Sequence, residues 1–271
     1  MIRRGVQSLG PHLGAASARA VLALLSLFVT LSVTASAPPA ARGDDVELVD
    51  GVFQLLIVAR DGRFVSSGTA FFVDAKGTAL TNSHVVYRAF HDPDHFLLLA
   101  VVAKEFYSAS ITCASQIGTD PTLTDRGPLD RDVAEIQLAP STFPYQMIRL
   151  PGHIDLVSAT AHTTELPAFP ALTFGDDPRE GQQVRVVGFG LTSEVPEEEW
   201  GTTGTVMFAS NAIDGTPIFQ IQSVKRPRPG NSGSPVLDDQ NHVVGMYTWN
   251  MITNDQLGFA ISSSALIHPC P

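Results

Sequence analysis

The chain has 271 residues, of which 44% are hydrophobic and 16% charged, an ordinary balance for a packed globular protein. The formal net charge of −10 argues against nucleic acid as a partner, because a phosphate backbone repels an acidic surface. Glycine (22 residues) and proline (19 residues) are frequent, Val, Ile, Phe and Thr recur in short runs, and long stretches at helical period are missing. This composition predicts many short strands joined by tight turns, and therefore an all-β fold.

The first 35 residues have the organisation of an export signal. Positive charge precedes the apolar stretch Ala20–Val33, and small residues follow it (Arg3, Arg4 and Arg19; Ala35, Ser36 and Ala37). We expect cleavage after Ala35, and a secreted or periplasmic protein with no stable membrane span. A twin-arginine signal and an uncleaved membrane anchor are the alternatives. The apolar run is short for an anchor and contains several hydroxyl side chains.

Two β domains are expected, over residues 51–160 and 161–271, after a flexible leader at residues 36–50. The first series of strand-like runs is Val52–Val58, Ser67–Val73, Ala79–Thr81, Phe96–Ala103, Ser108–Cys113 and Asp132–Leu138. The second series is Gln183–Gly188, Gly204–Ala209, Pro217–Ser223, Pro235–Leu237, His242–Trp249 and Leu257–Ser262. The irregular stretch Leu150–Ala171, which carries three prolines, is expected to cross from one domain to the other.

The segment Gly230–Pro235 is the first of three motifs that carry chemistry. Glycines on both sides of Ser232 allow a tight turn that exposes the hydroxyl and points successive N–H groups to one side. Such a turn can stabilise the oxyanion that forms when a hydroxyl attacks a carbonyl. The same residue types also occur in loops without a catalytic role, so this motif alone leaves both interpretations open.

The other two motifs supply a histidine and a carboxylate. In Ala79–Val86 an apolar strand runs into a turn at His84, where an imidazole at the strand end can face a cleft. The alternating segment Asp132–Leu138 predicts a strand with Asp132 at its entry, where a carboxylate can accept the Nδ1 hydrogen of a histidine. Asp130 is the competing carboxylate, and we prefer Asp132 because it directly precedes the apolar alternation.

In this order, the segments LTNSHVV, DVAEIQL and GNSGSPV resemble those of trypsin-like serine peptidases of the chymotrypsin fold. Bacterial glutamyl endopeptidases and HtrA-type proteases are the most similar branch. The resemblance extends from Val52 to Ser262. It implies two six-stranded antiparallel β-barrels with the active site in the cleft between them. It also implies an exported serine endopeptidase that cleaves proteins or peptides through an acyl-enzyme.

The resemblance implies a role for each residue of the three motifs. Ser232 would be the nucleophile, His84 its general base and Asp132 the carboxylate that orients the imidazole. The N–H groups of Gly230 and Ser232 would form the oxyanion hole. A catalytically silent binding protein on the same fold is the competing hypothesis, although silent relatives usually lose a member of the trio.

The resemblance also implies the substrate-binding residues Thr248, Trp249, Asn250 and Arg226. The first three would pair with the peptide as an added strand, with Trp249 in the wall of the S1 pocket, which receives the side chain before the scissile bond. The cations of Lys225–Arg228 could favour an acidic side chain there. We prefer a small or medium apolar one, because glutamyl endopeptidases usually carry a histidine where this chain has Tyr247–Trp249. Asn250, where many relatives have Gly, argues against a broad pocket.

Two features of activated or regulated relatives are not expected. Digestive trypsins carry an aspartate just before the nucleophile, and a freed N-terminus pairs with it. Here that position is the uncharged Asn231, so an activation switch of that kind is not expected. Neither is the peptide-binding module that follows the protease in HtrA-type proteins.

The cysteines and one histidine pair remain. Because an exported protein meets an oxidising compartment, we expect a disulfide between Cys113 and Cys270, with two unpaired thiols as the alternative. His91 and His95 have the spacing of a metal site on a helix, but Pro93 between them argues against that helix. No metal or other cofactor is therefore expected. The oligomeric state is not predicted.

Overall fold

The computed structural model describes residues 49–115, 131–141, 165–192, 195–251, 254 and 256–269. The expected export signal, most of the leader, Asp130, Cys270 and the boundary between the two expected domains lie outside the described residues. Among the described residues, no helix is long and apolar enough to cross a membrane.

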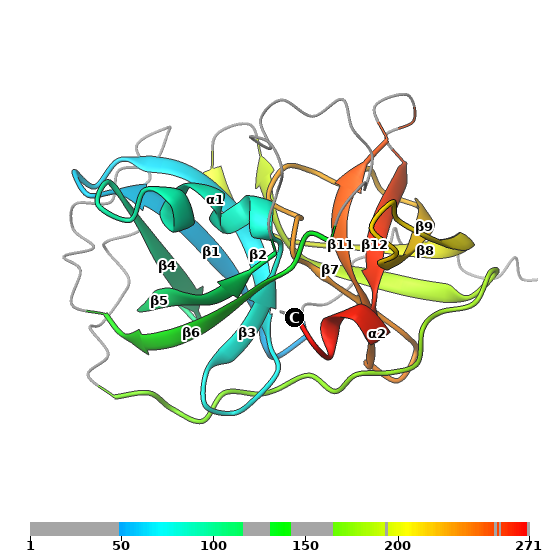
Figure 1. The fold of residues 1–271 in the computed structure, drawn as a ribbon, viewed down its shortest axis with the longest axis horizontal. Helices are drawn as coiled ribbons and strands as arrows, with labels where there is room; N and C mark the ends of the chain where they lie inside the picture. Colours follow the sequence, from blue (N-terminus) through cyan, green and yellow to red (C-terminus); the bar gives the residue numbers. More distant parts are fainter. Residues whose placement is uncertain are drawn as a thin grey trace, which may run out of the picture. The chain divides into compact units, whose positions relative to one another are not determined.

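The first six strands close into one antiparallel barrel in the order β1-β2-β3-β6-β5-β4 (Figure 1). Their bounds are β1 Val52–Ala59, β2 Phe64–Phe72, β3 Thr78–Thr81, β4 Phe96–Val102, β5 Glu105–Ala114 and β6 Ala134–Pro140. Helix α1, Ser83–His91, follows β3 directly.

The other six strands close into a second antiparallel barrel in the order β10-β11-β12-β9-β8-β7. Their bounds are β7 Gln183–Thr192, β8 Val195–Asn211, β9 Pro217–Ser223, β10 Pro235–Leu237, β11 Val243–Asn250 and β12 Leu257–Ser262. The short helix α2, Ser263–Leu266, follows the last strand. The expected all-β fold of two six-stranded barrels is confirmed.

The local setting of His84 differs from the predicted strand end. The strand ends at Thr81, and His84 lies in the first turn of α1. The helix forms because it has an apolar face: Val85, Val86 and Ala89 are buried in the core of the first barrel. The side chain of Asn82, the residue before the helix, makes no capping hydrogen bond, so no local side chain caps the helix and packing of its apolar face stabilises it.

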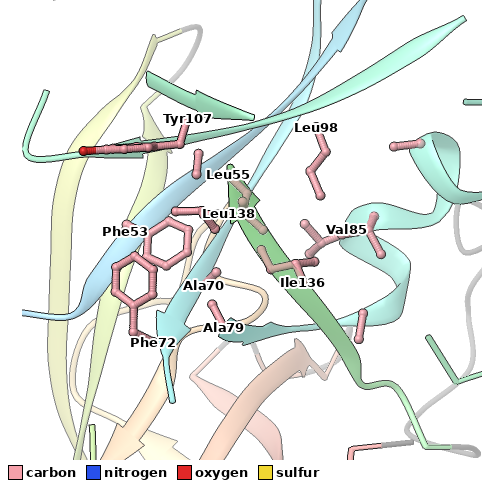
Figure 2. Close-up of a cluster of buried hydrophobic side chains, with 14 of the residues drawn as sticks. Phe53, Leu55, Ala70, Phe72, Ala79, Val85, Leu98, Tyr107, Ile136 and Leu138 are labelled. Carbon is pink, nitrogen blue, oxygen red and sulfur yellow. The ribbon is translucent and has the colours of Figure 1, made fainter. Parts of the chain in front are cut away.

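The interior of the first barrel is filled with alternating inward-facing side chains. Figure 2 shows the rings of Phe53 and Phe72 packed together, and their centroids are 4.4 Å apart. Val85 of α1 belongs to the same cluster as Ile136 of β6. The helix that carries His84 is thereby fixed to the strand that follows Asp132.

A separate apolar cluster joins the two barrels. Phe71 and Leu80 of the first barrel pack in one cluster with Val187 and Met246 of the second. Because these side chains are fully buried, the contact between the barrels is a dry core rather than a solvated hinge. The two halves of any site that spans both barrels are therefore held in register.

Strand pairing brings the three predicted catalytic motifs to the ends of their strands. Thr81 pairs with Ala134, so the chain leaving β3 towards His84 runs beside the chain that enters β6 from Asp132. In the second barrel Pro235 pairs with Met246, and this register sets the turn around Ser232 against the end of β11.

Candidate active site

His84 and Asp132 form a bidentate pair. The Nδ1 atom of His84 lies 2.6 Å from Asp132 Oδ2, and the backbone N–H of the same histidine donates to Asp132 Oδ1 over 2.9 Å. The carboxylate side chain is only 6% exposed, whereas the imidazole is 24% exposed. One residue therefore accepts two hydrogen bonds from the other, which fixes both the ring and the backbone that carries it, and leaves the ring edge open to solvent.

The backbone on both sides of Asp132 is held by side chains of the first barrel. The hydroxyl of Ser115 accepts from Val133 N–H over 2.9 Å and donates to the carbonyl of Arg131 over 2.5 Å. The hydroxyl of Ser83 donates to the carbonyl of Val133 over 2.6 Å. These contacts make the loop before β6 rigid where it presents the carboxylate.

Asn82 connects this loop to the second barrel. Its fully buried amide nitrogen donates to the carbonyl of Asp132 over 2.8 Å and to the hydroxyl of Thr248 over 3.2 Å. Since the carbonyl of Asp132 can only accept, the nitrogen must face it. The amide oxygen of Asn82 then stays buried without a partner among the described residues, a cost that the tie between barrels offsets.

Ser232 lies in a tight turn whose peptide groups alternate in direction. The N–H groups of Asn231, Gly233 and Ser234 donate to carbonyls within the second barrel. Those of Gly230 and Ser232 have no acceptor among the described residues. Gly233 has φ +86°, and a Cβ there would approach the carbonyl oxygen of Thr69 to 2.0 Å, so only glycine fits.

Thr69 of β2 fastens this turn to the first barrel. Its N–H donates to the carbonyl of Ser232 and its hydroxyl donates to the carbonyl of Gly230, both over 2.9 Å. The same hydroxyl accepts from the N–H of Phe189 over 2.9 Å. These two bonds hold the peptide planes that follow Gly230 and Ser232, and the bond from Ser234 N–H to the Asn231 carbonyl holds the plane that carries the unbonded N–H of Ser232.

The hydroxyl of Ser232 donates to the carbonyl of Thr248 over 3.1 Å. The neighbouring Trp249 lies edge-on to His84, with 6.2 Å between the ring centroids. Thr248 and Trp249 therefore connect the turn that carries Ser232 to the imidazole of His84, and all three predicted catalytic residues lie around the end of β11.

The predicted substrate-binding residues lie on two segments next to Ser232. Thr248 is buried, and Trp249 and Asn250 are half-buried at the end of β11. The amide nitrogen of Asn250 donates to the carbonyl of Pro227 over 3.4 Å. Arg226, the residue before Pro227, is exposed. The segment before Ser232 and the end of β11 thus lie side by side.

The C-terminal segment is attached to the loop that carries Asp132. The guanidinium of Arg131 donates to the carbonyls of Ala265 and His268. Its backbone N–H donates to Asp214 Oδ2 over 2.6 Å. Burial by itself would raise the pKa of Asp214, but hydrogen bonds from Thr216 and Arg131 outweigh it and lower the pKa below its usual value. Cys113 lies on β5 near this loop, and Cys270 lies outside the described residues.

The histidines considered as metal ligands are engaged in other contacts. The Nδ1 atom of His95 lies 2.7 Å from Asp92 Oδ1, and this hydrogen bond raises the pKa of His95. His91 packs its ring against Tyr87. Within the described segments, no group of three or more His, Cys, Asp and Glu side chains could hold a metal ion.

Sequence reasoning missed two residues that organise this site, Thr69 and Asn82. Thr69 appears in the sequence only as a hydroxyl residue in an apolar strand, and its partners lie 161 and 120 residues away. Asn82 stands in the motif that contains His84, but its role depends on contacts with Asp132 and Thr248. A hydroxyl or amide residue inside an otherwise apolar strand end is the one signal that could have found them.

Comparison with known proteins identifies the class. The model of the trypsin-like peptidase domain matches residues 68–246, so the chain belongs to that family and is a serine endopeptidase. Among solved structures it is similar to the active form of the Rv3671c protease from M. tuberculosis, with 17% identity and a TM-score of 0.53 over 81% of this chain and 79% of that one. It is also similar to Deg5, with 20% identity and a TM-score of 0.54 over 81% and 86%. At these identities the two structures support the fold.

Proposed function

We propose that this serine protease hydrolyses peptide bonds with the triad Ser232, His84 and Asp132. The observation that carries the proposal is the bidentate pairing of Asp132 with His84, at 2.6 and 2.9 Å. A carboxylate bound to Nδ1 selects the tautomer whose Nε2 can accept a proton, which is what a general base for a serine needs.

In the proposed reaction, the hydroxyl of Ser232 turns from the carbonyl of Thr248 towards Nε2 of His84. His84 takes the hydroxyl proton while the serine oxygen bonds to the scissile carbonyl carbon, and later delivers that proton to the leaving amine. Asp132 stabilises the imidazolium that forms between these steps. A water then attacks the carbonyl carbon of the acyl-enzyme. His84 takes a proton from this water and delivers it to the Ser232 oxygen as the acid product leaves.

The oxyanion of the tetrahedral intermediate would be bound by the N–H groups of Gly230 and Ser232. Both donors lack an acceptor within the described part of the chain; the peptide plane of the Ser232 N–H is held by Ser234 at the Asn231 carbonyl, and Thr69 holds the neighbouring planes. Donors that are fixed in advance need no reorganisation when charge develops, and each is worth about 3 kcal/mol of barrier.

Replacing the nucleophile tests the triad. Ser232→Ala should abolish cleavage of an unstructured protein such as casein while leaving thermal unfolding nearly unchanged. Ser234→Ala is the matched control two residues away: its hydroxyl is buried without a partner among the described residues, so its removal should leave cleavage near normal. Cleavage by Ser232→Ala at a rate near that of the wild-type protein would refute the assignment of Ser232 as the nucleophile.

We also propose that the protein is exported after removal of residues 1–35 and carries a disulfide between Cys113 and Cys270. The attachment of His268 to Arg131, whose carbonyl is bonded to Ser115, supports this pairing, because Cys113 and Ser115 lie two residues apart. No free-terminus switch is proposed. Asn231 uses its side-chain oxygen within its own turn, accepting from Arg228 N–H over 2.6 Å.

A further inference from the structure

We propose that Tyr247 fills the subsite for the side chain before the scissile bond, so that the enzyme cleaves after Gly, Ala or Ser and excludes larger residues. This inference rests on the proposed function, because it concerns the space beside Ser232.

The subsite lies between two chain segments that leave Ser232 side by side. One segment runs back through Gly230 to Pro227, and the other runs forward from Thr248 to Asn250. They are bridged beside the nucleophile by the 3.1 Å hydrogen bond from Ser232 Oγ to the Thr248 carbonyl. They are bridged again at the far end by the 3.4 Å hydrogen bond from Asn250 to the Pro227 carbonyl.

Chemistry at Ser232 determines what must enter this space. The attacked carbon must lie at the serine oxygen, with its own oxygen towards the N–H groups of Gly230 and Ser232. The substituent on that carbon, which carries the side chain before the scissile bond, then extends between the two segments. Whatever occupies the space between them sets the size of the residue that can be accepted.

The phenol of Tyr247 reaches the outer end of this space. Its hydroxyl donates to the side-chain oxygen of Asn250, whose amide nitrogen holds Pro227. We call these two contacts the Tyr247–Asn250 bridge; it spans from one segment to the other. The phenol also packs on Gly258 of β12, where a Cβ would approach the tyrosine oxygen to 2.1 Å. Two strands, β11 and β12, and the loop at Pro227 therefore hold the phenol in place.

The ring cannot be displaced at small cost. Tyr247 is only 2% exposed and its ring packs with Val184, Phe219 and Ala260 in the core of the second barrel. Moving it would open a cavity in that core and leave Asn250 without its partner. A substrate with a bulky residue before the scissile bond must meet that cost, whereas a methyl or hydroxymethyl group need not.

The same arrangement disfavours an acidic residue in the subsite. Burial raises the pKa of Tyr247, so the phenol is neutral, and its proton is already donated to Asn250. Arg226 and Arg228, in the segment before the nucleophile, are exposed to solvent. A carboxylate entering the subsite would lose its water without a charged partner inside it.

The test is a set of peptides that differ only in the residue before the scissile bond, namely Gly, Ala, Val, Phe and Glu. For the wild-type protein we expect kcat/KM for Ala to exceed that for Phe or Glu by about 100-fold. Tyr247→Val and Asn250→Gly should each reduce the ratio of Ala to Phe at least about tenfold. Tyr247→Phe is the graded comparison: it loses the hydrogen bond to Asn250 but keeps the ring in the core, so the ratio should fall less than in Tyr247→Val.

Labelling of Ser232 by a small fluorophosphonate separates the failure of this inference from that of the proposed function. A wild-type protein that takes no label refutes the triad itself. A labelled wild-type protein that cleaves after Phe or Glu as fast as after Ala refutes the filled subsite alone. If Tyr247→Val does not fold, Asn250→Gly decides, since it changes a half-buried residue at the end of the bridge. An unchanged ratio in a labelled Asn250→Gly protein would also refute the inference.

Discussion

Asp132→Asn removes one acceptor from a carboxylate that uses both oxygens on His84. The asparagine keeps one oxygen and gains an NH2 group. If the oxygen retains the backbone N–H of His84, at 2.9 Å in the native protein, the NH2 group faces Nδ1. The imidazole must then carry its proton on Nε2, and it can no longer take one from Ser232. The reverse orientation sets two donors against each other at a site that is only 4% exposed, which costs about 1–3 kcal/mol.

The first orientation is therefore preferred, and activity is lost because His84 is held in the tautomer whose Nε2 already carries a proton. In the well-studied template of this mechanism the same change lowers kcat by about 10⁴, and we expect a similar loss, equivalent to about 5 kcal/mol of barrier. Steady-state kinetics on an Ala peptide measures it, with a thermal melt to show that the fold survives. Asp130→Asn is the control, and its kcat should stay near normal. If Asp132→Asn retains kcat within tenfold of wild type, or if Asp130→Asn shows the large loss instead, the choice of carboxylate is wrong.

Three further predictions concern the supports of the site. Thr69→Val removes the hydroxyl that positions the Gly230 carbonyl and should lower kcat about 10–100-fold with little change in KM. The control Thr112→Val, on the exposed side of β5, should leave kcat near the wild-type value. Equal kcat in the two variants would contradict this role of Thr69. Asp214 has a lowered pKa in the folded state, so it contributes stability above its unfolded pKa of 3.8, and this is lost as the pH falls through the folded pKa. Asp214→Asn should therefore lower the melting temperature at pH 7 and make it depend less on pH in acid. If the melting temperatures of wild type and variant fall in parallel as the pH is lowered, the prediction is wrong. Removing the proposed disulfide with Cys113→Ser should cost about 4–5 kcal/mol of unfolding free energy in the chain-entropy model, and two alkylatable thiols in oxidised protein would show that no such bond exists.

Most strands were predictable because they have an alternating or continuous apolar pattern between turn residues; β8 is an exception, because it begins at Val195 with an acidic stretch and only Gly204–Ala209 was predicted. The predicted run Pro217–Ser223 matches β9 residue for residue, and Asp132 stands just before β6 as expected. The closure of each series into a barrel did not follow from these patterns and came from the resemblance. Helix α1 was missed because Val85 and Val86 are β-branched and the preceding Asn82 makes no capping hydrogen bond; burial in the barrel and the distant carboxylate of Asp132 support the helix instead.

Within the site, the residue types that perform chemistry were easier to find than those that hold them. His84, Asp132 and Ser232 stand in motifs whose order along the chain is informative. Thr69 and Asn82 act across the contact between the barrels, and no local pattern reports such a contact. Tyr247 is a similar case. In the sequence it is notable only because a histidine is usual nearby, whereas its position against Gly258 depends on how β11 pairs with β12.

The central claim is that Ser232 is a nucleophile activated by His84. The most direct measurement is the intact mass of the protein after reaction with a fluorophosphonate, followed by peptide mapping of the adduct. We predict a single adduct on Ser232 that forms rapidly in the wild-type protein and does not form in His84→Ala protein that melts at the normal temperature. An adduct on another residue, or labelling of Ser232 at an unchanged rate without His84, would contradict the account.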